Sequence, residues 1–450
     1  MISKILRVTG VFMTATVLIL AQCSLVDSIG KGKPSWPRWR GPKGDGVSAE
    51  TDWDPTALAG GPEVLWSVDV GIGYSSVVFS GDRLFTLRRA GDSWLLCLDA
   101  ESGAELWRYP FDERHECQPT PCTDGRSVYG LDKGGELVCL NVKNGELRWK
   151  RDIGTDFGAE TLHYGYAQSP VLAGDVLLLN VNTSGIGVNK KTGELLWASQ
   201  PHTIKLYEGY YATPLVYQRD GSTRALLFSG TGLFSVDVHS GEPMWFHEWI
   251  DRTYQDSSKQ GNAADPVLFE DEVFIASGHG LKQCALLNIE GAEPRVIWRN
   301  ENLRNEFSAS IFLDGYLYGY DGNASHPNAL RCLEWRSGKV MWEKKIPVAS
   351  ITAAGNRLIV LETRGGLLIL EATPSAYTEI ASCRLIQETG IHKWWTPPVL
   401  YRGGSTAGIT LGIWSASTCA SRNLQREHPQ GRIPDSGHSP AIRLGCTLQS

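Results

Sequence analysis

Short apolar runs alternate with glycine-containing turns along most of the chain. Residues 95–107 read LLCLDAESGAELW, and residues 137–149 read LVCLNVKNGELRW. Each copy starts as an apolar strand, turns at Ser-Gly or Asn-Gly, and ends in a second strand that carries a tryptophan. Glycine adopts the positive φ that such a hairpin needs without steric cost. The pattern therefore predicts β-hairpins, and beyond the N-terminal region no stretch shows a convincing helical period.

The hairpin recurs every 45 residues or so, and a regular period of about this length indicates a repeat architecture. Further copies are GVNKKTGELLW (187–197), SVDVHSGEPMW (235–245), CLEWRSGKVMW (332–342) and the degenerate LLNIEGAEPRVIW (286–298). Another strand pair precedes the copies, for example at residues 170–172 and 176–179. Four strands per unit are typical of a propeller blade. The tryptophans of the series are Trp66, Trp107, Trp149, Trp197, Trp245, Trp298 and Trp342.

This pattern, a strand, an Asp or Asn, a Ser/Thr/Asn-Gly turn and a Trp, resembles the tryptophan-docking repeat of quinoprotein propellers. The resemblance covers roughly residues 62–402. It implies that the tryptophan of one blade packs against the turn of its neighbour, so these tryptophans would be structural. Burial of each indole would contribute about 2–3 kcal/mol.

The number of repeat units sets the expected fold. Seven units lie between residues 75 and 382, and an eighth begins near residue 395. The resemblance implies an all-β, eight-bladed propeller of the quinoprotein type, whose last blade is completed by an N-terminal strand that carries Trp66. We therefore expect a signal peptide at 1–23, an N-terminal arm at 24–61, the propeller at 62–403 and a separate tail at 404–450.

Charge and the N-terminal residues indicate where such a protein works. The chain has 43 Lys and Arg against 49 Asp and Glu, so no strong field attracts nucleic acid or an anionic membrane. Lys4 and Arg7 precede an apolar run at residues 8–21, which predicts a secretory signal peptide. The stretch LAQC (20–23) resembles a lipobox except at Gln22. Lipidation at Cys23 and ordinary export to the periplasm or cell envelope of a bacterium are both open.

The arm is rich in tryptophan, proline and glycine but has no period. Its residues 34–54 read PSWPRWRGPKGDGVSAETDWD. Because aromatic-rich segments seldom stay exposed, we expect Trp36 and Trp39 to pack onto the propeller wall.

One set of polar and aromatic residues is a candidate ligand-binding face. In a propeller, the residues that lead into each innermost strand meet at one mouth of the central channel, and loops on a rigid scaffold often carry binding residues. The alternative is that they only start strands and satisfy backbone groups. The candidates are Tyr74, Tyr166, Gln168, Tyr211, Asp265 and Trp395.

Catalytic chemistry has little support in the sequence. Quinoprotein dehydrogenases of this resemblance bind pyrroloquinoline quinone and calcium, use an aspartate base and often carry adjacent cysteines. This chain has no adjacent cysteines and no C-x-x-C-H haem motif, and we carry over no catalytic residue and no metal ligand.

We therefore expect an exported, non-catalytic binding or scaffold propeller that engages a protein or a small ligand. It is similar to the outer-membrane-assembly scaffold lipoproteins of Gram-negative bacteria, and a membrane would be reached only through a lipid at Cys23. The alternative is a quinone-dependent alcohol or sugar dehydrogenase with calcium.

The tail stops following the repeat. After Gly403 it reads GSTAGITLGIWSASTCASRNLQREHPQGRIPDSGHSPAIRLGCTLQS, without alternation and without a docking turn. Shifting the reading frame back by one base permits V-Y-C-R-N-H-L-G-D-L-V-C-L-D in place of residues 405–418, which is a close copy of the missing strands. We infer a frameshifted tail that is poorly ordered and leaves blade eight short of strands; a genuinely divergent tail is the alternative.

Overall fold

The computed structural model describes residues 35–51, 53–61, 63–70, 73–90, 92–112, 119–206, 209–253, 257–322, 327–385, 392–393, 396–401, 409–412, 416–417 and 442–445. The chain divides into two units, Met1–Lys33 and Pro34–Ser450. All described residues belong to the second unit, so the expected signal peptide and Cys23 lie outside them. No helix among the described residues is long and apolar enough to cross a membrane.

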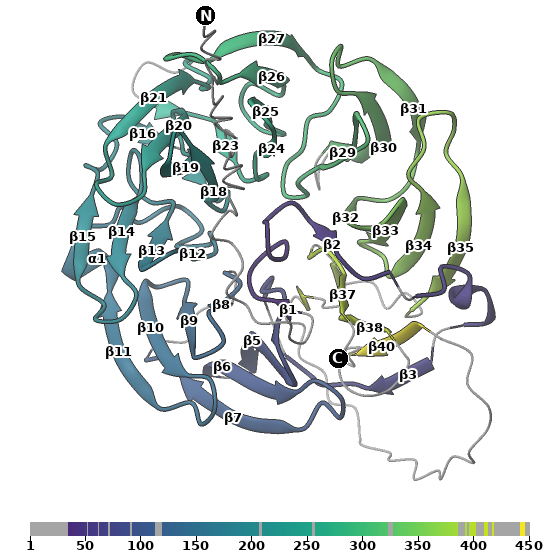
Figure 1. The fold of residues 1–450 in the computed structure, drawn as a ribbon, viewed down its shortest axis with the longest axis horizontal. Coiled ribbons are helices and arrows are strands. Elements are labelled where there is room, and N and C mark those ends of the chain that lie inside the picture. The colour runs from purple at the N-terminus through teal and green to yellow at the C-terminus, as the bar shows by residue number, and fades with distance from the viewer. Residues whose placement is uncertain are drawn as a thin grey trace, which may run out of the picture. The chain divides into compact units, whose positions relative to one another are not determined.

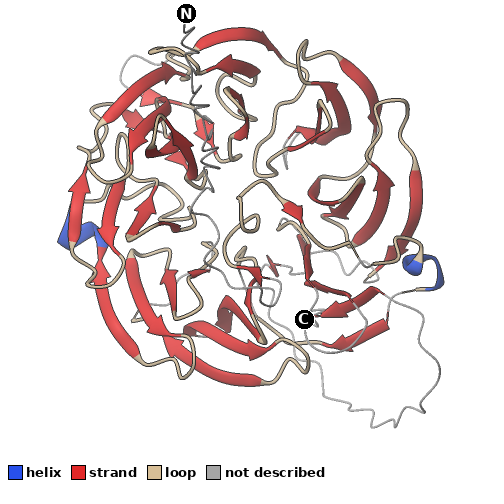
Figure 2. Cartoon of the chain, in the orientation of Figure 1, coloured by secondary structure: helices blue, strands red, loops and turns tan. Residues whose placement is uncertain are grey.

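Strands dominate the described chain, as Figure 2 shows, and the predicted all-β class is confirmed. The helices are the five-residue α1 (Ile153–Phe157) and a short 3-10 turn (Ala57–Gly60). Asp152 caps α1 by accepting a hydrogen bond from the Thr155 amide at 2.9 Å, and Gly158 ends it in the left-handed conformation.

Eight sheets of four or five strands account for most described strands, and we number them in chain order. Sheet 1 contains β1 (Ser35–Trp36), β4 (Val78–Ser80), β5 (Arg83–Ala90), β6 (Asp92–Asp99) and β7 (Glu105–Pro110). Sheet 2 contains β8 (Cys122–Thr123), β9 (Ser127–Leu131), β10 (Glu136–Asn141) and β11 (Leu147–Asp152). Sheet 3 contains β12 (Val171–Ala173), β13 (Val176–Leu179), β14 (Ile186–Asn189) and β15 (Leu195–Ala198). Sheet 4 contains β18 (Leu215–Arg219), β19 (Ser222–Phe228), β20 (Gly232–Asp237) and β21 (Pro243–Glu248).

The remaining sheets continue the order. Sheet 5 contains β24 (Val267–Phe269), β25 (Glu272–Ala276), β26 (Cys284–Asn288) and β27 (Arg295–Asn300). Sheet 6 contains β28 (Ile311–Leu313), β29 (Tyr316–Gly322), β30 (Pro327–Glu334) and β31 (Val340–Lys344). Sheet 7 contains β2 (Val47–Ser48), β32 (Ala349–Ala354), β33 (Arg357–Glu362), β34 (Gly366–Glu371) and β35 (Glu379–Arg384). Sheet 8 contains β37 (Val399–Tyr401), β38 (Ile409–Gly412), β40 (Ile442–Gly445) and β3 (Glu63–Trp66).

Three strand pairs lie outside these sheets. They are β16 (Lys205–Leu206) with β22 (Ser257–Ser258), β17 (Gly209–Tyr210) with β23 (Gly261–Asn262), and β36 (His392–Lys393) with β39 (Ala416–Ser417).

Sheets 1 to 7 share one plan, in which four consecutive strands of the repeat pair in antiparallel order. The first strand of each lies near a common axis and the fourth lies at the periphery (Figure 1). Sheet 8 departs from this plan because β40 runs parallel to both β38 and β3. The tail thus supplies three described strands, β38, β39 and β40, whereas most of residues 404–450 lie outside the described residues.

The hydrophobic core lies between neighbouring sheets. Leu95 of sheet 1 and Val138 of sheet 2 belong to one buried cluster, and equivalent clusters join each following pair of sheets. Leu400 of sheet 8 packs with sheet 7, and Tyr401 packs with sheet 1. Sheet 8 therefore contacts the first and the seventh sheets.

The series tryptophans lie at these junctions. A Cβ added to Gly145, Gly193 or Gly338 would come within 2.7–2.8 Å of the ring of Trp107, Trp149 or Trp298 from the preceding sheet. Trp66 lies in the same way against Gly103, and Trp197 against Gly241. Most of the indoles also donate a hydrogen bond to the receiving turn, for example from Trp149 Nε1 to the Lys190 carbonyl at 3.0 Å. Trp342 donates to the Thr373 carbonyl at 2.7 Å, whereas neither Trp66 nor Trp245 has an acceptor among the described residues.

Candidate functional site at the axis

Polar residues at the start of the innermost strands link one sheet to the next. The Ser76 amide donates to Thr120 Oγ1, and the Thr120 amide donates to Ser169 Oγ, both at 2.9 Å. The Thr213 amide donates to Asp265 Oδ1 at 2.7 Å. These side chains satisfy backbone groups that would otherwise be buried without partners.

The N-terminal arm enters this region and meets Asp265. Trp39 Nε1 donates to Asp265 Oδ2 at 2.6 Å, and Arg40 Nη1 lies 3.8 Å from the same oxygen. Arg40 Nη2 donates to the Ser310 carbonyl at 2.6 Å and to the Asp45 carbonyl at 2.9 Å. The carboxylate of Asp265 is therefore engaged by the chain's own residues.

Burial dominates the electrostatics of this contact. The side chain of Arg40 is 2% exposed and that of Asp265 is 8% exposed. Burial raises the pKa of the Asp265 carboxyl, and the nearby Arg40 guanidinium opposes that rise. Burial likewise lowers the pKa of Arg40. Each charge makes the burial of the other tolerable, since an isolated charge in this environment would be costly.

Two candidate ligand residues are core residues in the structure. Tyr166 is 1% exposed, belongs to the cluster between sheets 2 and 3, and donates its hydroxyl to the Ala159 carbonyl at 2.9 Å. Burial raises the pKa of Tyr166. Gln168 is fully buried, and neither atom of its amide group has a hydrogen-bond partner among the described residues. Neither side chain is open to a ligand from solvent.

The other candidates have different surroundings. Tyr74 is half-buried beside the start of β4. Tyr211 is also half-buried, and its hydroxyl accepts a hydrogen bond from the Tyr164 amide at 3.1 Å. Tyr164 is 48% exposed and packs on His163. Trp395 lies outside the described residues. The five described candidates thus occupy core, axial and half-buried positions.

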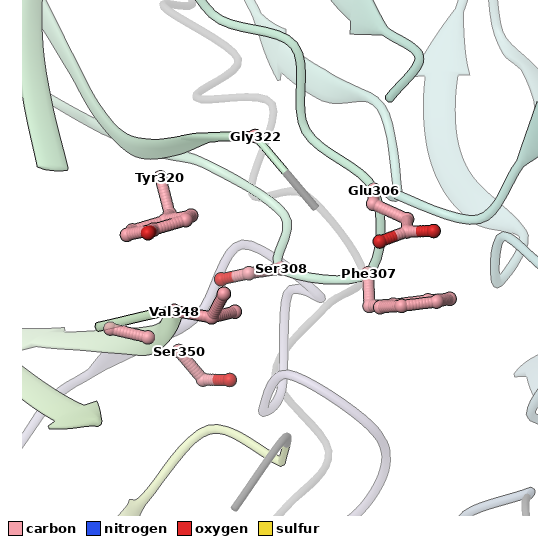
Figure 3. A pocket seen from close by; sticks show the side chains of 8 residues that line it. Glu306, Phe307, Ser308, Tyr320, Gly322, Val348 and Ser350 are labelled. Atoms are coloured by element: carbon pink, nitrogen blue, oxygen red, sulfur yellow. The ribbon is translucent and has the colours of Figure 1, made fainter. Parts of the chain in front are cut away.

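A small pocket lies where sheets 6 and 7 meet, and sequence reasoning did not select it. Its volume is about 10 Å³, which is room for about one water molecule. Figure 3 shows Ser308, Val348 and Ser350 grouped there, with Tyr320 on one side and Glu306 on the other. Glu306 is 7% exposed and pairs with His279. The signal in the sequence was an acidic residue in the segment that leads into β28, five positions before Ile311.

A calcium–quinone site at the axis would need a set of oxygen ligands. Calcium takes about six to eight oxygen ligands. Within the described part of the chain, no three His, Cys, Asp or Glu residues gather as a metal-binding group. Both oxygens of Asp265 already accept N–H groups of Thr213 and Trp39.

Comparison with known proteins identifies the family. The family model described as "Outer membrane protein assembly factor BamB" matches residues 56–129 and 91–344. The chain belongs to this family. BamB of Moranella endobia is 23% identical over 379 residues, which are 78% of this chain and 78% of that protein. The tetrathionate hydrolase of Acidithiobacillus ferrooxidans is 25% identical over 236 residues, which are 48% of this chain and only 44% of that enzyme.

Solved structures agree with the family in fold. BamB from Moraxella catarrhalis aligns with a TM-score of 0.56 at 14% identity, over 75% of this chain and 95% of that one. The quinohemoprotein alcohol dehydrogenase from Comamonas testosteroni aligns with a TM-score of 0.59 at 11% identity, over 82% of this chain and 75% of that one. The predicted resemblance to quinone-repeat β-propellers of the BamB type is confirmed, and at these identities the structural likeness concerns fold alone.

Proposed function

We propose that this chain is an exported, non-catalytic propeller that acts as a protein-binding scaffold in outer-membrane protein assembly. The observation that carries the proposal is the engagement of the axial carboxylate by Trp39 and Arg40, because quinoprotein enzymes use the axis for their cofactor. Membership of the BamB family supports the same function.

The proposal includes eight blades, with β3 completing the last. Trp66 of β3 lies against Gly103 in the turn of sheet 1. Tyr401 of β37 stacks on Phe79 with ring centroids 4.2 Å apart, and its hydroxyl bonds the Gly81 carbonyl. These contacts support a sheet 8 that follows sheet 7 and precedes sheet 1.

Deletion of the gene in its native bacterium tests the scaffold function. We expect lower amounts of outer-membrane β-barrel proteins, restored by the intact gene on a plasmid. Unchanged amounts of these proteins would contradict the proposal.

In a second experiment, the purified chain is incubated with pyrroloquinoline quinone and calcium. Saturable binding with dye-linked alcohol oxidation would favour the dehydrogenase instead.

Two terminal features belong to the same proposal. A Cys23→Ser variant that no longer partitions into detergent would support lipidation, whereas unchanged partitioning would support ordinary export. Sequencing the gene around codon 403 tests the frameshift in the tail, and an intact frame without an added or lost base would reject it.

A further inference from the structure

Residues 35–48, here called the arm segment, form a tightly turned structure. Gly41 has φ 80° and its added Cβ would lie 2.9 Å from the Trp36 ring; Gly46 has φ 77° and its Cβ would lie 2.5 Å from Ile311. The Gly46 amide donates to the Arg40 carbonyl at 2.9 Å, and Arg40 itself has φ 58°. Positive φ and these close approaches both favour glycine. The glycines therefore allow the arm segment to follow this tightly turned backbone path.

The arm segment contacts several sheets along its path across the axis. The Pro37 carbonyl accepts from the Thr123 amide of sheet 2 at 2.9 Å. Trp39 bonds Asp265, which precedes sheet 5, and Arg40 bonds the Ser310 carbonyl, which precedes sheet 6. Ser48 Oγ donates to the Leu400 carbonyl of sheet 8 at 3.1 Å.

Its two ends become fifth strands of different sheets. Strand β1 pairs with β4 through Ser35–Ser80 and Trp36–Phe79, and so extends sheet 1. Strand β2 runs parallel to β32 and extends sheet 7, while the Ala353 amide donates to the Gly46 carbonyl at 2.9 Å. Both strands lie near the axis in Figure 1. Sheets 1 and 7 are the two that pack against sheet 8.

We propose that the arm segment is a clasp that joins sheet 1 to sheet 7 across sheet 8 and is locked by Arg40 on Asp265 and Ser310. Apart from the pairing of β2 with β32, which the arm segment itself makes, sheet 8 is the one large sheet among the described residues that contains parallel pairings, so we take it as the junction at which the seven regular sheets would part. The clasp bypasses that junction through backbone hydrogen bonds to the inner strands on either side. Its opening would expose the edges of β4 and β32, and unpaired edges are open to other strands.

Hydrogen exchange on the full chain tests the clasp with Arg40→Met. This change removes the donors to Ser310 and leaves the Asp265 carboxylate without its cation. We expect exchange at the Ala353 amide and in β37 to become at least about tenfold faster, because the local opening free energy falls. Amides of β10 and β20, in regular sheets, should keep their rates.

Arg331→Met is the matched control. Arg331 is also a mostly buried arginine, which pairs with Asp321 at 2.9 Å and donates to the Asn302 carbonyl at 2.7 Å, but it does not belong to the clasp. For Arg331→Met we expect faster hydrogen exchange around β30 and unchanged exchange at Ala353 and β37. If Arg331→Met accelerates Ala353 and β37 as much as Arg40→Met does, the effect is global and the clasp is rejected.

Trp39→Phe serves if Arg40→Met does not fold, since it removes the N–H bond to Asp265 and part of the ring but keeps the Arg40 cation beside Asp265. Trypsin cleavage after the exposed Lys43 reports release of the arm segment directly. We expect faster cleavage together with faster exchange in β37. Faster cleavage with wild-type exchange in β37 would overturn the proposal, because the arm segment would then be attached without holding the sheets together.

Discussion

The two junctions on either side of sheet 4 show what a docking tryptophan needs. At the first, Trp197 lies against Gly241 and donates its indole N–H to the Val238 carbonyl at 2.8 Å. At the second, Trp245 is 7% exposed but its N–H finds no acceptor in the part of the chain that the structure describes. Burial of the ring and the indole hydrogen bond are therefore separable parts of the junction.

An arginine replaces the missing hydrogen bond at the second junction. Arg219 Nη1 donates to the Ile289 carbonyl at 2.5 Å, and Nη2 donates to the Glu290 carbonyl at 2.8 Å. Ile289 follows Asn288 as Val238 follows Asp237, so its carbonyl is the repeat-equivalent acceptor. At the degenerate turn after Asn288, the equivalent carbonyl therefore still accepts a hydrogen bond. The donor is Arg219 instead of the docking tryptophan.

We expect the largest difference in the free energy of unfolding between the variants Gly241→Ala and Gly221→Ala. Both glycines have positive φ, 73° and 76°, but only the new methyl at position 241 would overlap the Trp197 ring. The strain in φ costs about 1–2 kcal/mol, and the overlap adds about 1–3 kcal/mol. Chemical denaturation should show the larger loss for Gly241→Ala, and equal losses would show that the ring has room to move.

Arg219→Met sharpens the comparison at the second junction. It removes two hydrogen bonds from a cation, so we expect a loss of about 1.5–3 kcal/mol in the free energy of unfolding. Arg224→Met is the control, because Arg224 in the same sheet pairs with the exposed Asp220 at 3.2 Å. Such a pair contributes about 0–1 kcal/mol. A control loss as large as that of Arg219→Met would refute a special role for Arg219.

Phenylalanine in place of the tryptophans isolates the indole N–H. Trp197→Phe loses both ring area and the bond to Val238, whereas Trp245→Phe loses ring area alone. The difference between their unfolding free energies should be about 1 kcal/mol. Equal unfolding free energies would mean that water replaces the hydrogen bond to Val238 with no loss of stability.

The smallest effect concerns the residue that opens the turn, which is Asp99 in sheet 1 and Asn141 in sheet 2. The Ser102 hydroxyl bonds the Asp99 carboxylate at 2.7 Å and lowers its pKa. A lowered pKa contributes stability above the unfolded value of about 3.9, and this contribution is lost as pH falls through the folded value. Asp99→Asn should keep stability near neutral pH and flatten its acid dependence. An unchanged acid slope would contradict this assignment.

Local pattern was sufficient for the strands and turns. Asn144-Gly145 and Thr192-Gly193 specify hairpins through nearby residues alone, and both glycines have positive φ in the structure. The propeller class follows because every unit repeats the same alternation. We expected Trp36 and Trp39 to pack onto the propeller wall: Trp36 is 3% exposed in a strand that pairs with the innermost strand of sheet 1, and Trp39 bonds Asp265 near the axis.

The environment of the candidate site residues depended on contacts that no local pattern encodes. Tyr166 and Gln168 precede a strand just as Asp265 does, yet the first two are core residues and the third binds the arm. Their sequence neighbourhoods are similar, whereas the sheets that cover them differ.

By itself, the sequence determined the repeat, the hairpins and the family of this protein, because each rests on residues a few positions apart and on their recurrence. Only the tertiary structure decided that Trp39 meets Asp265, 226 residues away, and that the arm joins sheets 1 and 7. Partners at such separation are selected when the sheets pack around the axis, where a buried arginine requires a carboxylate and backbone carbonyls.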